Sequence, residues 1–214
     1  MRDTSLCAAL EDRELAALHV SRSRHIMPAG YPMGDCGDLC ANIVSGALKL
    51  SLHAKDGREQ IVDLMFAGDF LGTPRVREQI VTATTLAQTE ICAFSRHDFA
   101  HALDTFPPMR RMLVERAIAA SERARGRLRM LGHSSARERV AVFILYITAH
   151  ADGKPVRIPL RREEVANFLG LAAETVSRQL GHLRAEGVIT LVNARDCTVL
   201  DHERLCAIAR SPNF

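Results

Sequence analysis

The sequence predicts an α+β fold in three parts: an N-terminal antiparallel β-roll, a long helix and a C-terminal winged helix-turn-helix. Short apolar runs separated by glycine-containing turns extend from Arg24 to Ser95, which is typical of a small antiparallel roll. A helical pattern of about 25 residues then follows Pro107 without interruption. The stretch Leu160–Glu186 contains two short helical patterns joined by a glycine turn. We place the three parts at residues 1–106, 107–132 and 136–214.

The length and the charge of the chain limit its function only loosely. Its 214 residues are enough for two domains, and a formal net charge of +3 is too small to indicate nucleic-acid binding by itself. No apolar run is long enough to cross a bilayer, and acidic residues stand where a signal peptide would need its apolar core. We therefore expect a cytoplasmic protein with no membrane partner. Its six cysteines are then expected to be thiols or metal ligands rather than disulfides.

The N-terminal part is expected to contain a short helix followed by a series of strands. Residues 4–20 have the apolar spacing of an amphipathic helix. The clearest turn is Lys55-Asp56-Gly57-Arg58, because Asp-Gly between two apolar runs is a strong hairpin signal. A helix at Arg96–Leu103 follows the last strand. The expected strands are Ala41–Val44, Ala47–Leu52, Gln60–Phe66, Ile80–Thr85 and Glu90–Phe94.

The long helix is expected to run from Pro107 to Leu131, since a proline suits the first turn of a helix. Its length of roughly 37 Å exceeds what one small domain needs. Apolar residues recur along one side at three- and four-residue steps, and arginines cover the rest. This stripe could be buried against its own domain, but the pattern favours pairing with the same helix of a second chain. The dimerisation residues would be Met109, Met112, Leu113, Ala117, Ala120, Ala124 and Leu128.

The second short helix of the Leu160–Glu186 stretch is expected at Ala173–Gly187, after a turn in which Gly170 can take the left-handed conformation. At about 100° per residue, Val176, Leu180 and Leu183 form one narrow apolar stripe. The residues almost opposite are Glu174, Ser177, Arg178 and Gly181. A solvated helix needs no such combination. A helix in a DNA major groove does need it. There arginine can pair with guanine edges, glutamate can accept a hydrogen bond from the cytosine amine, and serine can contact bases or phosphates. The expected DNA-contacting residues are Glu174, Thr175, Ser177 and Arg178.

The segments around this stretch complete a winged domain. Gly132-His133-Ser134-Ser135 is the expected hinge after the long helix, and Ala136–Ala149 is a further helix. Val156–Ile158 is expected to form a short strand. The runs Val188–Val192 and Thr198–Leu200 flank a turn-forming segment and predict a hairpin wing.

This order of parts resembles the CRP/FNR family of bacterial transcription regulators over nearly the whole chain. The landmarks that carry the resemblance are Ser45–Lys49, Phe66–Gly72 and Leu169–Arg178. The resemblance implies a cyclic-nucleotide-binding-like sensor roll in a regulator that is not an enzyme. Glu174, Ser177 and Arg178 look like the triad of the FNR branch, which implies palindromic double-stranded DNA with TTGAT-like half-sites. The hairpin tip at residues 55–59 corresponds to a surface with which relatives touch RNA polymerase, although a solvated turn explains it equally well.

The chain departs from the family at the ligand site. Cyclic-AMP-binding relatives carry a glutamate and an arginine–serine pair after the segment that ends here at Gly72. No acidic residue directly follows Gly72, and Ile80 and Val81 stand where the arginine–serine pair is expected. We therefore expect no cyclic nucleotide, although Arg75 and Arg77 could attract an anion.

Four cysteines outside the DNA-binding domain are candidate ligands of an iron–sulfur cluster: Cys7, Cys36, Cys40 and Cys92. In the FNR branch, a cysteine in the last strand joins three N-terminal cysteines around a [4Fe-4S] cluster. Cys92 matches that strand position and Cys7 resembles the last of the N-terminal group, whereas Cys36 and Cys40 lie in the roll instead. Because such a cluster requires four soft thiolates, we expect these four to hold a cluster of the [4Fe-4S] type.

Other interpretations of the cysteines stay open. The four thiols could bind zinc, respond to redox state directly, or be buried as small apolar residues. An iron–sulfur enzyme is a rival of another class, but no acid–base or nucleophile constellation accompanies the cysteines. Cys197 and Cys206 are expected to be structural. A haem that senses nitric oxide is a further alternative, because a histidine can be an axial ligand of haem. The candidate histidines are His25, His53, His97, His101 and His133, and none of them lies in an attachment motif.

The sequence as a whole predicts a homodimeric transcription regulator that responds to oxygen or redox state. A bound cluster would bias how the long helices pair, and this pairing would set the spacing of the two DNA-reading helices. Only a ligand with different affinity for the two arrangements can shift them. A regulator of the same fold that senses nitric oxide through haem, senses redox state through thiols, or acts without an effector is the alternative.

Overall fold

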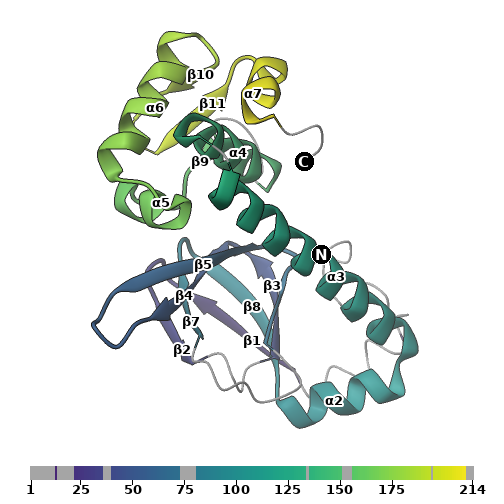
Figure 1. Ribbon diagram of the computed structural model, residues 1–214. Coiled ribbons are helices and arrows are strands. Elements are labelled where there is room, and N and C mark those ends of the chain that lie inside the picture. Colours follow the sequence, from purple (N-terminus) through teal and green to yellow (C-terminus); the bar gives the residue numbers. More distant parts are fainter. Residues whose placement is uncertain are drawn as a thin grey trace. The chain divides into compact units, whose positions relative to one another are not determined.

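The computed structural model describes Arg13 and residues 22–35, 40–72, 81–133, 135–150, 156–193 and 195–210. The chain divides into two compact units, Met1–Arg123 and Ala124–Phe214 (Figure 1). The division falls inside one continuous helix, α3 (Pro107–His133), which confirms the expected long helix and its start. The helix expected at residues 4–20 lies, apart from Arg13, outside the described residues. None of the helices in the described part combines the length and the apolarity that a bilayer crossing requires.

The first unit is the expected antiparallel roll. One sheet has the strand order β1-β8-β3-β6 and the other has the order β2-β7-β4-β5, each with four strands. Every pairing recorded between these strands is antiparallel. The strands are β1 (Arg22–Met27), β2 (Pro32–Asp35), β3 (Cys40–Ser45), β4 (Ala47–His53), β5 (Glu59–Phe66), β6 (Phe70–Leu71), β7 (Val81–Thr85) and β8 (Thr89–Phe94).

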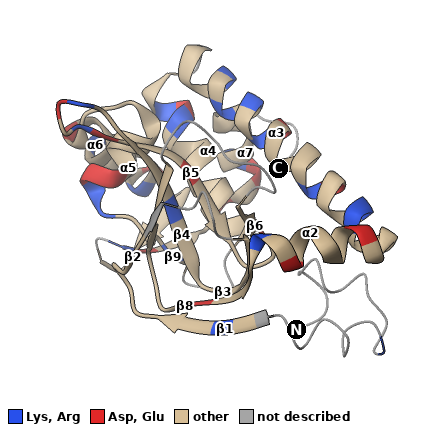
Figure 2. Ribbon diagram, turned by 90° about the horizontal axis from the view of Figure 1, so that it is seen from below, with Lys and Arg blue, Asp and Glu red and all other residues tan. Residues whose placement is uncertain are grey.

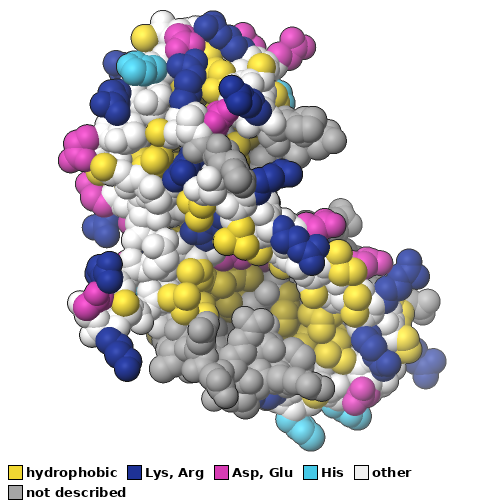
Figure 3. All heavy atoms as spheres, viewed as in Figure 1, with side chains coloured by type: hydrophobic (Ala, Val, Ile, Leu, Met, Phe, Trp, Pro, Cys, Tyr) yellow, Lys and Arg dark blue, Asp and Glu magenta, His cyan; other side chains and the backbone are white. Residues whose placement is uncertain are grey.

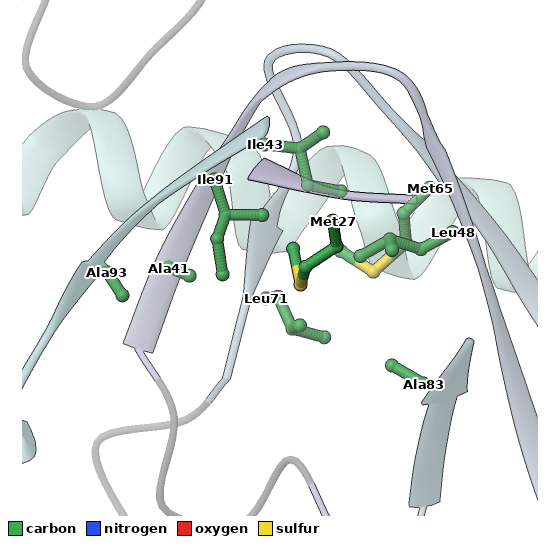
Figure 4. Close-up of a cluster of buried hydrophobic side chains, with 9 residues drawn as sticks. All are labelled: Met27, Ala41, Ile43, Leu48, Met65, Leu71, Ala83, Ile91 and Ala93. Atoms are coloured by element: carbon green, nitrogen blue, oxygen red, sulfur yellow. The ribbon is translucent and has the colours of Figure 1, made fainter. Parts of the chain in front are cut away.

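The core of the roll consists of small and medium apolar side chains that both sheets contribute. Figure 4 shows them gathered between the strands, with Ile43, Leu48 and Ile91 among the most deeply buried. Strand alternation explains the selection, because every second residue of a strand points to the same face. The complete cluster is Met27, Ala41, Ile43, Leu48, Met65, Leu71, Ala83, Ile91 and Ala93.

The hairpin between β4 and β5 forms where the Asp-Gly pair predicted it. Gly57 has a φ of +82°, which favours glycine, and its N–H donates to the carbonyl of Ala54 at 2.9 Å. The side chain of Asp56 accepts hydrogen bonds from the backbone N–H and the Nε of Arg58. The charged tip of this hairpin is exposed to solvent.

A second apolar cluster joins the roll to the start of α3. Helix α2 (Arg96–Thr105) begins at Ser95, whose hydroxyl oxygen accepts the N–H of Asp98 at 3.0 Å. Its Phe99 stacks on Phe70 with the ring centroids 4.7 Å apart. The buried members of the cluster are Cys40, Phe94, Phe99, Ala102 and Met109. The first turn of α3 is therefore part of the roll.

The second unit is the expected winged helix-turn-helix. A three-stranded antiparallel sheet of order β10-β11-β9 lies beside its helices (Figure 1). The hairpin of β10 and β11 confirms the wing, and β9 confirms the short strand before the helix-turn-helix. The elements are α4 (Ala136–Ala149), β9 (Val156–Arg157), α5 (Arg162–Leu169), α6 (Ala173–Ala185), β10 (Ile189–Leu191), β11 (Asp196–Val199) and α7 (His202–Ala209).

Candidate nucleic-acid interface

The turn between α5 and α6 has the geometry that the sequence predicts. Gly170 ends α5 with φ 62° and ψ 43°, the left-handed conformation that costs glycine least. The N–H of Leu171 donates to the carbonyl of Ala166 at 3.0 Å, which satisfies one of the carbonyls that the end of a helix leaves free. This tight reversal fixes the direction in which α6 leaves α5.

One face of α6 is buried, and it is the face that the apolar spacing predicted. Val176, Leu180 and Leu183 are all buried against the rest of the second unit. Burying each such side chain contributes about 1.5–3 kcal/mol, so this stripe determines how the helix is rotated about its axis. The rotation in turn decides which side chains face solvent.

The opposite face of α6 presents polar side chains to solvent. Glu174, Ser177 and Arg178 are exposed, and no hydrogen bond or ion pair within the described part of the chain engages them. Thr175 is half-buried at the flank of this face. A Cβ added at Gly181 would meet nothing within 4 Å, so the surface beside these residues is open. Such a helix can enter a DNA groove without first breaking contacts of its own.

The start of α6 is suited to a phosphate group. Its N-cap, Ala172, makes no side-chain capping hydrogen bond, so its side chain satisfies none of the first backbone N–H groups of the helix. These groups and the helix dipole together favour an anion. At the other end of α6, His182 and Arg184 complement the negative end of the dipole.

The wing next to α6 is held by a small hydrogen-bonded turn. The side-chain oxygen of Asn193 accepts the backbone N–H groups of Arg195 and Asp196 at 2.8 and 2.9 Å. The exposed side chain of Val192 lies at the start of this turn. The described residues of the wing thus form a hairpin of β10 and β11 next to α6 in the chain.

The described candidate cluster ligands lie together on the roll. In the strand register, Cys40 is opposite Phe94 and Cys92 is opposite Asn42, so the two cysteines are diagonal neighbours on one face of the sheet. Cys40 is fully buried, and burial raises the pKa of its thiol although Arg96 opposes the shift. Cys92 is half-buried. Cys7 and Cys36 lie outside the described residues.

Cys197 and the histidines considered for haem show no arrangement for binding a metal within the described residues. Cys197 is buried, and burial raises the pKa of its thiol to about 11 with Arg162 opposing, which supports the expected structural role. In the ranges that the structure covers, no three His, Cys, Asp or Glu side chains are grouped to hold a metal ion. The histidines considered for haem, His25, His53, His97 and His101, are exposed, and the side chain of His133 is not described.

The expected dimerisation stripe divides between two environments, which corrects one of its members. Met109 is 0% exposed inside the core of its own roll, so it cannot contact a second chain. Met112 and Leu113 are half-buried against the same cluster. Further along α3, Ala117 and Ala124 are exposed and Ala120 is half-buried.

Two residues that the sequence analysis missed lie on the exposed side of α3. Val114 is 53% exposed and Ile118 is 56% exposed, and Leu128 on the same helix is 71% exposed. At about 100° per residue these three fall within about 80° of one another. Figure 3 shows apolar side chains between the basic ones along α3, and Figure 2 shows basic residues, all arginine in this helix, recurring along it. The four-residue spacing of Val114 and Ile118, which places both on one side of a helix, could have indicated this surface from the sequence.

Known protein families match both units of the chain. The Crp-like helix-turn-helix domain matches residues 138–208, and the cyclic nucleotide-binding domain matches residues 31–106. A probable transcriptional activator of Rhizobium leguminosarum is 36% identical over 94% of this chain and 87% of its own length. The transcriptional activator protein FnrL of Cereibacter sphaeroides is 32% identical over 96% and 88%.

A solved structure supports the same fold. The structure of FixK2 from Bradyrhizobium japonicum superposes with a TM-score of 0.79 and 23% identity. The match covers 87% of this chain and 96% of FixK2. The likeness extends over both the roll and the winged unit, because neither alone could account for that coverage.

Proposed function

The chain belongs to the CRP/FNR family of transcription regulators, and from this premise we propose that it is a homodimer that reads palindromic DNA through α6. Regulators of this family bind DNA and dimerise, and they are not enzymes. The two relatives described above are named activators, which supports a role in activating transcription. The proposed half-sites are TTGAT-like.

The observation that carries this proposal is the exposed polar face of α6. Glu174, Ser177 and Arg178 have no partners within the described part of their own chain, so their hydrogen-bonding groups are left for base edges. Thr175 flanks them, and we propose it as a further contact. The buried stripe on the other side holds this face in a fixed orientation, which sequence-specific reading requires.

The affinity of Arg178→Ala for labelled duplexes tests the proposal. On a palindrome of TTGAT-like half-sites we expect a loss of about 1–3 kcal/mol, together with relaxed preference at one base pair. The matched control is Arg184→Ala, which removes an exposed arginine from the last turn of the same helix. The control should change affinity by a similar factor on all sequences. Equal loss on all sequences with Arg178→Ala would instead make Arg178 a phosphate contact.

We also propose that dimerisation uses the exposed apolar side of α3. Val114, Ile118 and Leu128 supply the large side chains, and Ala117 and Ala124 lie beside them. Large exposed apolar side chains on one helical stripe are typical of a helix that pairs with another helix. Ala120 lies at the margin of this surface, next to the part of α3 that faces the roll.

For the effector we propose an iron–sulfur cluster, with Cys7, Cys36, Cys40 and Cys92 as ligands. The support is the chemistry of four thiolates and the position of Cys40 and Cys92 on one sheet face. Cys40 would have to lose its proton against the effect of burial, which raises the pKa of its thiol. When bound, such a cluster supplies an oxygen-sensitive group whose loss would favour a dimer that cannot bind the operator.

Protein purified without air decides between the effector proposals. A cluster predicts absorbance in the visible range, iron and acid-labile sulfide, and operator binding that falls on exposure to air. Haem would give a Soret band without sulfide. Metal-free protein whose DNA binding follows thiol oxidation would support thiol sensing. Metal-free protein with unchanged binding would leave a regulator without a redox effector.

The exposed hairpin tip between β4 and β5 is the proposed contact with RNA polymerase. Lys55, Asp56 and Arg58 are exposed at this tip. Reversing the charge of Lys55 should lower transcription from a target promoter while leaving DNA affinity unchanged.

A further inference from the structure

The last turns of α3 are attached to the helix-turn-helix by Arg127. Its Nη2 donates to the carbonyl oxygen of Phe168 at 3.2 Å, and its guanidinium carbon lies 4.1 Å from the centroid of the Phe168 ring. Phe168 is buried near the end of α5. Because guanidinium stacks on an aromatic face and donates in its own plane at the same time, arginine fits this position and lysine does not.

A second arginine makes a parallel connection from α4. Arg139 donates through Nη2 to the carbonyl of Leu131 in α3 at 2.8 Å. Through Nη1 it donates to the carbonyls of Leu169 and Gly170 at 3.0 and 3.4 Å. These carbonyls belong to the ends of α3 and α5, where the helical hydrogen-bond pattern leaves acceptors unsatisfied. One side chain therefore joins the end of α3 to the turn that starts the DNA-reading helix.

The missing Cβ of Gly170 would lie at ordinary van der Waals distance from side chains of this junction. A Cβ at Gly170 would lie 3.4 Å from Cδ2 of Leu131 and 3.6 Å from Nη1 of Arg139. The N-cap of α6, Ala172, comes two residues later in the chain. The turn that contacts the end of α3 is therefore directly followed by α6.

The same helix is held to the roll one turn before Arg127. Nη2 of Arg123 donates to Oδ1 of Asp69 at 3.0 Å, and Oδ2 of Asp69 accepts the N–H of Phe66. The Arg123 contact lies within the first unit and the Arg127 contact lies within the second.

We propose that Arg127 and Arg139 are positioning residues that transmit the placement of α3 to α6, and so fix the distance between the two reading helices of a dimer. This inference rests on the proposed function, because it matters only if two copies read two half-sites. Half-sites on one face of a duplex must be separated by whole turns of DNA, so a small change in helix spacing costs affinity. Neither arginine needs to touch DNA for this effect.

The test compares full-length wild type with Arg127→Ala and Arg139→Ala on a series of palindromes. The spacer between half-sites is shortened and lengthened by one base pair and by half a turn, and a duplex with a lone half-site is included. For each variant we expect about a tenfold loss on the preferred spacer, which is the scale of one charged hydrogen bond. We also expect a flattened spacer preference and an unchanged affinity for the lone half-site.

The matched control is Arg129→Ala, which removes one exposed arginine from the same part of α3. It should keep the sharp spacer preference of wild type. If Arg127→Ala does not fold, Arg127→Lys and Phe168→Leu carry the same comparison, because they remove the stacked contact with smaller changes in volume. If folded variants of both arginines keep the wild-type spacer preference, the proposal that Arg127 and Arg139 set the helix spacing is wrong. A wild type that ignores every duplex would instead overturn the proposed function.

Discussion

Gly46, at the turn between β3 and β4, shows how one residue can decide whether the roll closes. Its φ is +90°, and a Cβ there would lie 2.5 Å from the carbonyl oxygen of Gln88 and 2.7 Å from Cα of Thr89. Thr89 is itself buried, and its hydroxyl donates to the carbonyl of Ala47 at 3.2 Å. Backbone cannot move aside as a flexible side chain can, so the position requires glycine on two independent grounds.

Gly46→Ala is expected to destabilise the protein by about 2–4 kcal/mol, since the strain of a positive φ and a backbone clash add to each other. Denaturant unfolding followed by circular dichroism measures this. Gly30→Ala is the matched control, because Gly30 has a φ of +80° but nothing within 4 Å of its missing Cβ. The control should lose only about 1–2 kcal/mol, the cost of the backbone conformation. Equal losses would show that the strands shift to accept the new methyl group.

The sequence predicted the role of a residue correctly where local backbone conformation alone determines that role. Gly57 and Gly170 were predicted in turns and have the positive φ that those turns need. The cysteines were harder, because their role depends on what surrounds them in space. Nothing in the spacing of Cys36 and Cys40 shows that Cys40 packs beneath α2 with Phe94 and Phe99. Strand register, which sets that neighbourhood, depends on contacts far apart in the chain.

At the scale of elements, Glu186 holds the end of α6 in place. Its two carboxylate oxygens accept the guanidinium of Arg137 at 2.6 and 2.7 Å, and Oε2 also accepts Nη2 of Arg204 at 3.0 Å. These partners lie on α4 and α7, so one carboxylate joins three helices. The hydrogen bond from Arg137 lowers the pKa of the Glu186 carboxyl against the opposing effect of burial, and the charges of Arg137, Arg204 and His182 lower it further.

Because the folded state holds the Glu186 pKa below its ordinary value of 4.5, this carboxylate stabilises the fold at neutral pH. The contribution is present above that ordinary value and is lost as pH falls below it through the folded pKa. Glu186→Gln should therefore lower the Tm by a few degrees at pH 7. The difference between variant and wild type should shrink steadily in acid, which calorimetry at a series of pH values measures.

Glu203→Gln is the control for that experiment, since Glu203 is an exposed carboxylate of α7 in the same unit. It should leave the Tm nearly unchanged at every pH. A difference for Glu186→Gln that is the same at pH 7 and at pH 3 would show that the carboxylate charge is not what stabilises the three helices.

Periodicity predicted α6 well and α3 only in part, for one physical reason. An apolar stripe shows that a helix buries one side, but it does not show what covers that side. For α6 the rest of its own domain covers Val176, Leu180 and Leu183, so the pattern was sufficient. For α3 the roll covers Met109 at one end, whereas Val114 and Ile118 a few residues later remain exposed. Both environments select the same residue types, so the boundary between them could not be read from the pattern.

At the scale of the whole molecule, α3 belongs to both compact units. The contacts of the chain divide between Arg123 and Ala124, although the helix continues without a break to His133. Arg123 is ion-paired with Asp69 of the roll, and Arg127 is bonded to Phe168 of the winged unit. In the proposed function, a signal received in the roll would reach the DNA-reading unit along this continuous helix.

Ile118→Glu should convert the protein from a dimer to a monomer in solution. Ile118 is 56% exposed on the apolar side of α3, next to the exposed Val114. Burying a carboxylate without a partner costs several kcal/mol, and a symmetric interface contains the substitution twice. We therefore expect the dissociation constant of the dimer to rise by at least about a hundredfold, equivalent to about 3 kcal/mol. Analytical ultracentrifugation over a range of concentrations measures it.

Ala100→Glu serves as the control, because it places the same new charge on an exposed position of a different helix, α2, which contributes no residue to the proposed interface. It should leave the dissociation constant within about twofold of wild type, a difference of less than 1 kcal/mol. The monomeric Ile118→Glu protein should also keep its affinity for a lone half-site while losing its preference for the palindrome, since only the dimer can engage both halves. An unchanged dissociation constant for Ile118→Glu would show that the dimer contact lies elsewhere. Another surface would then set the spacing between the two α6 helices.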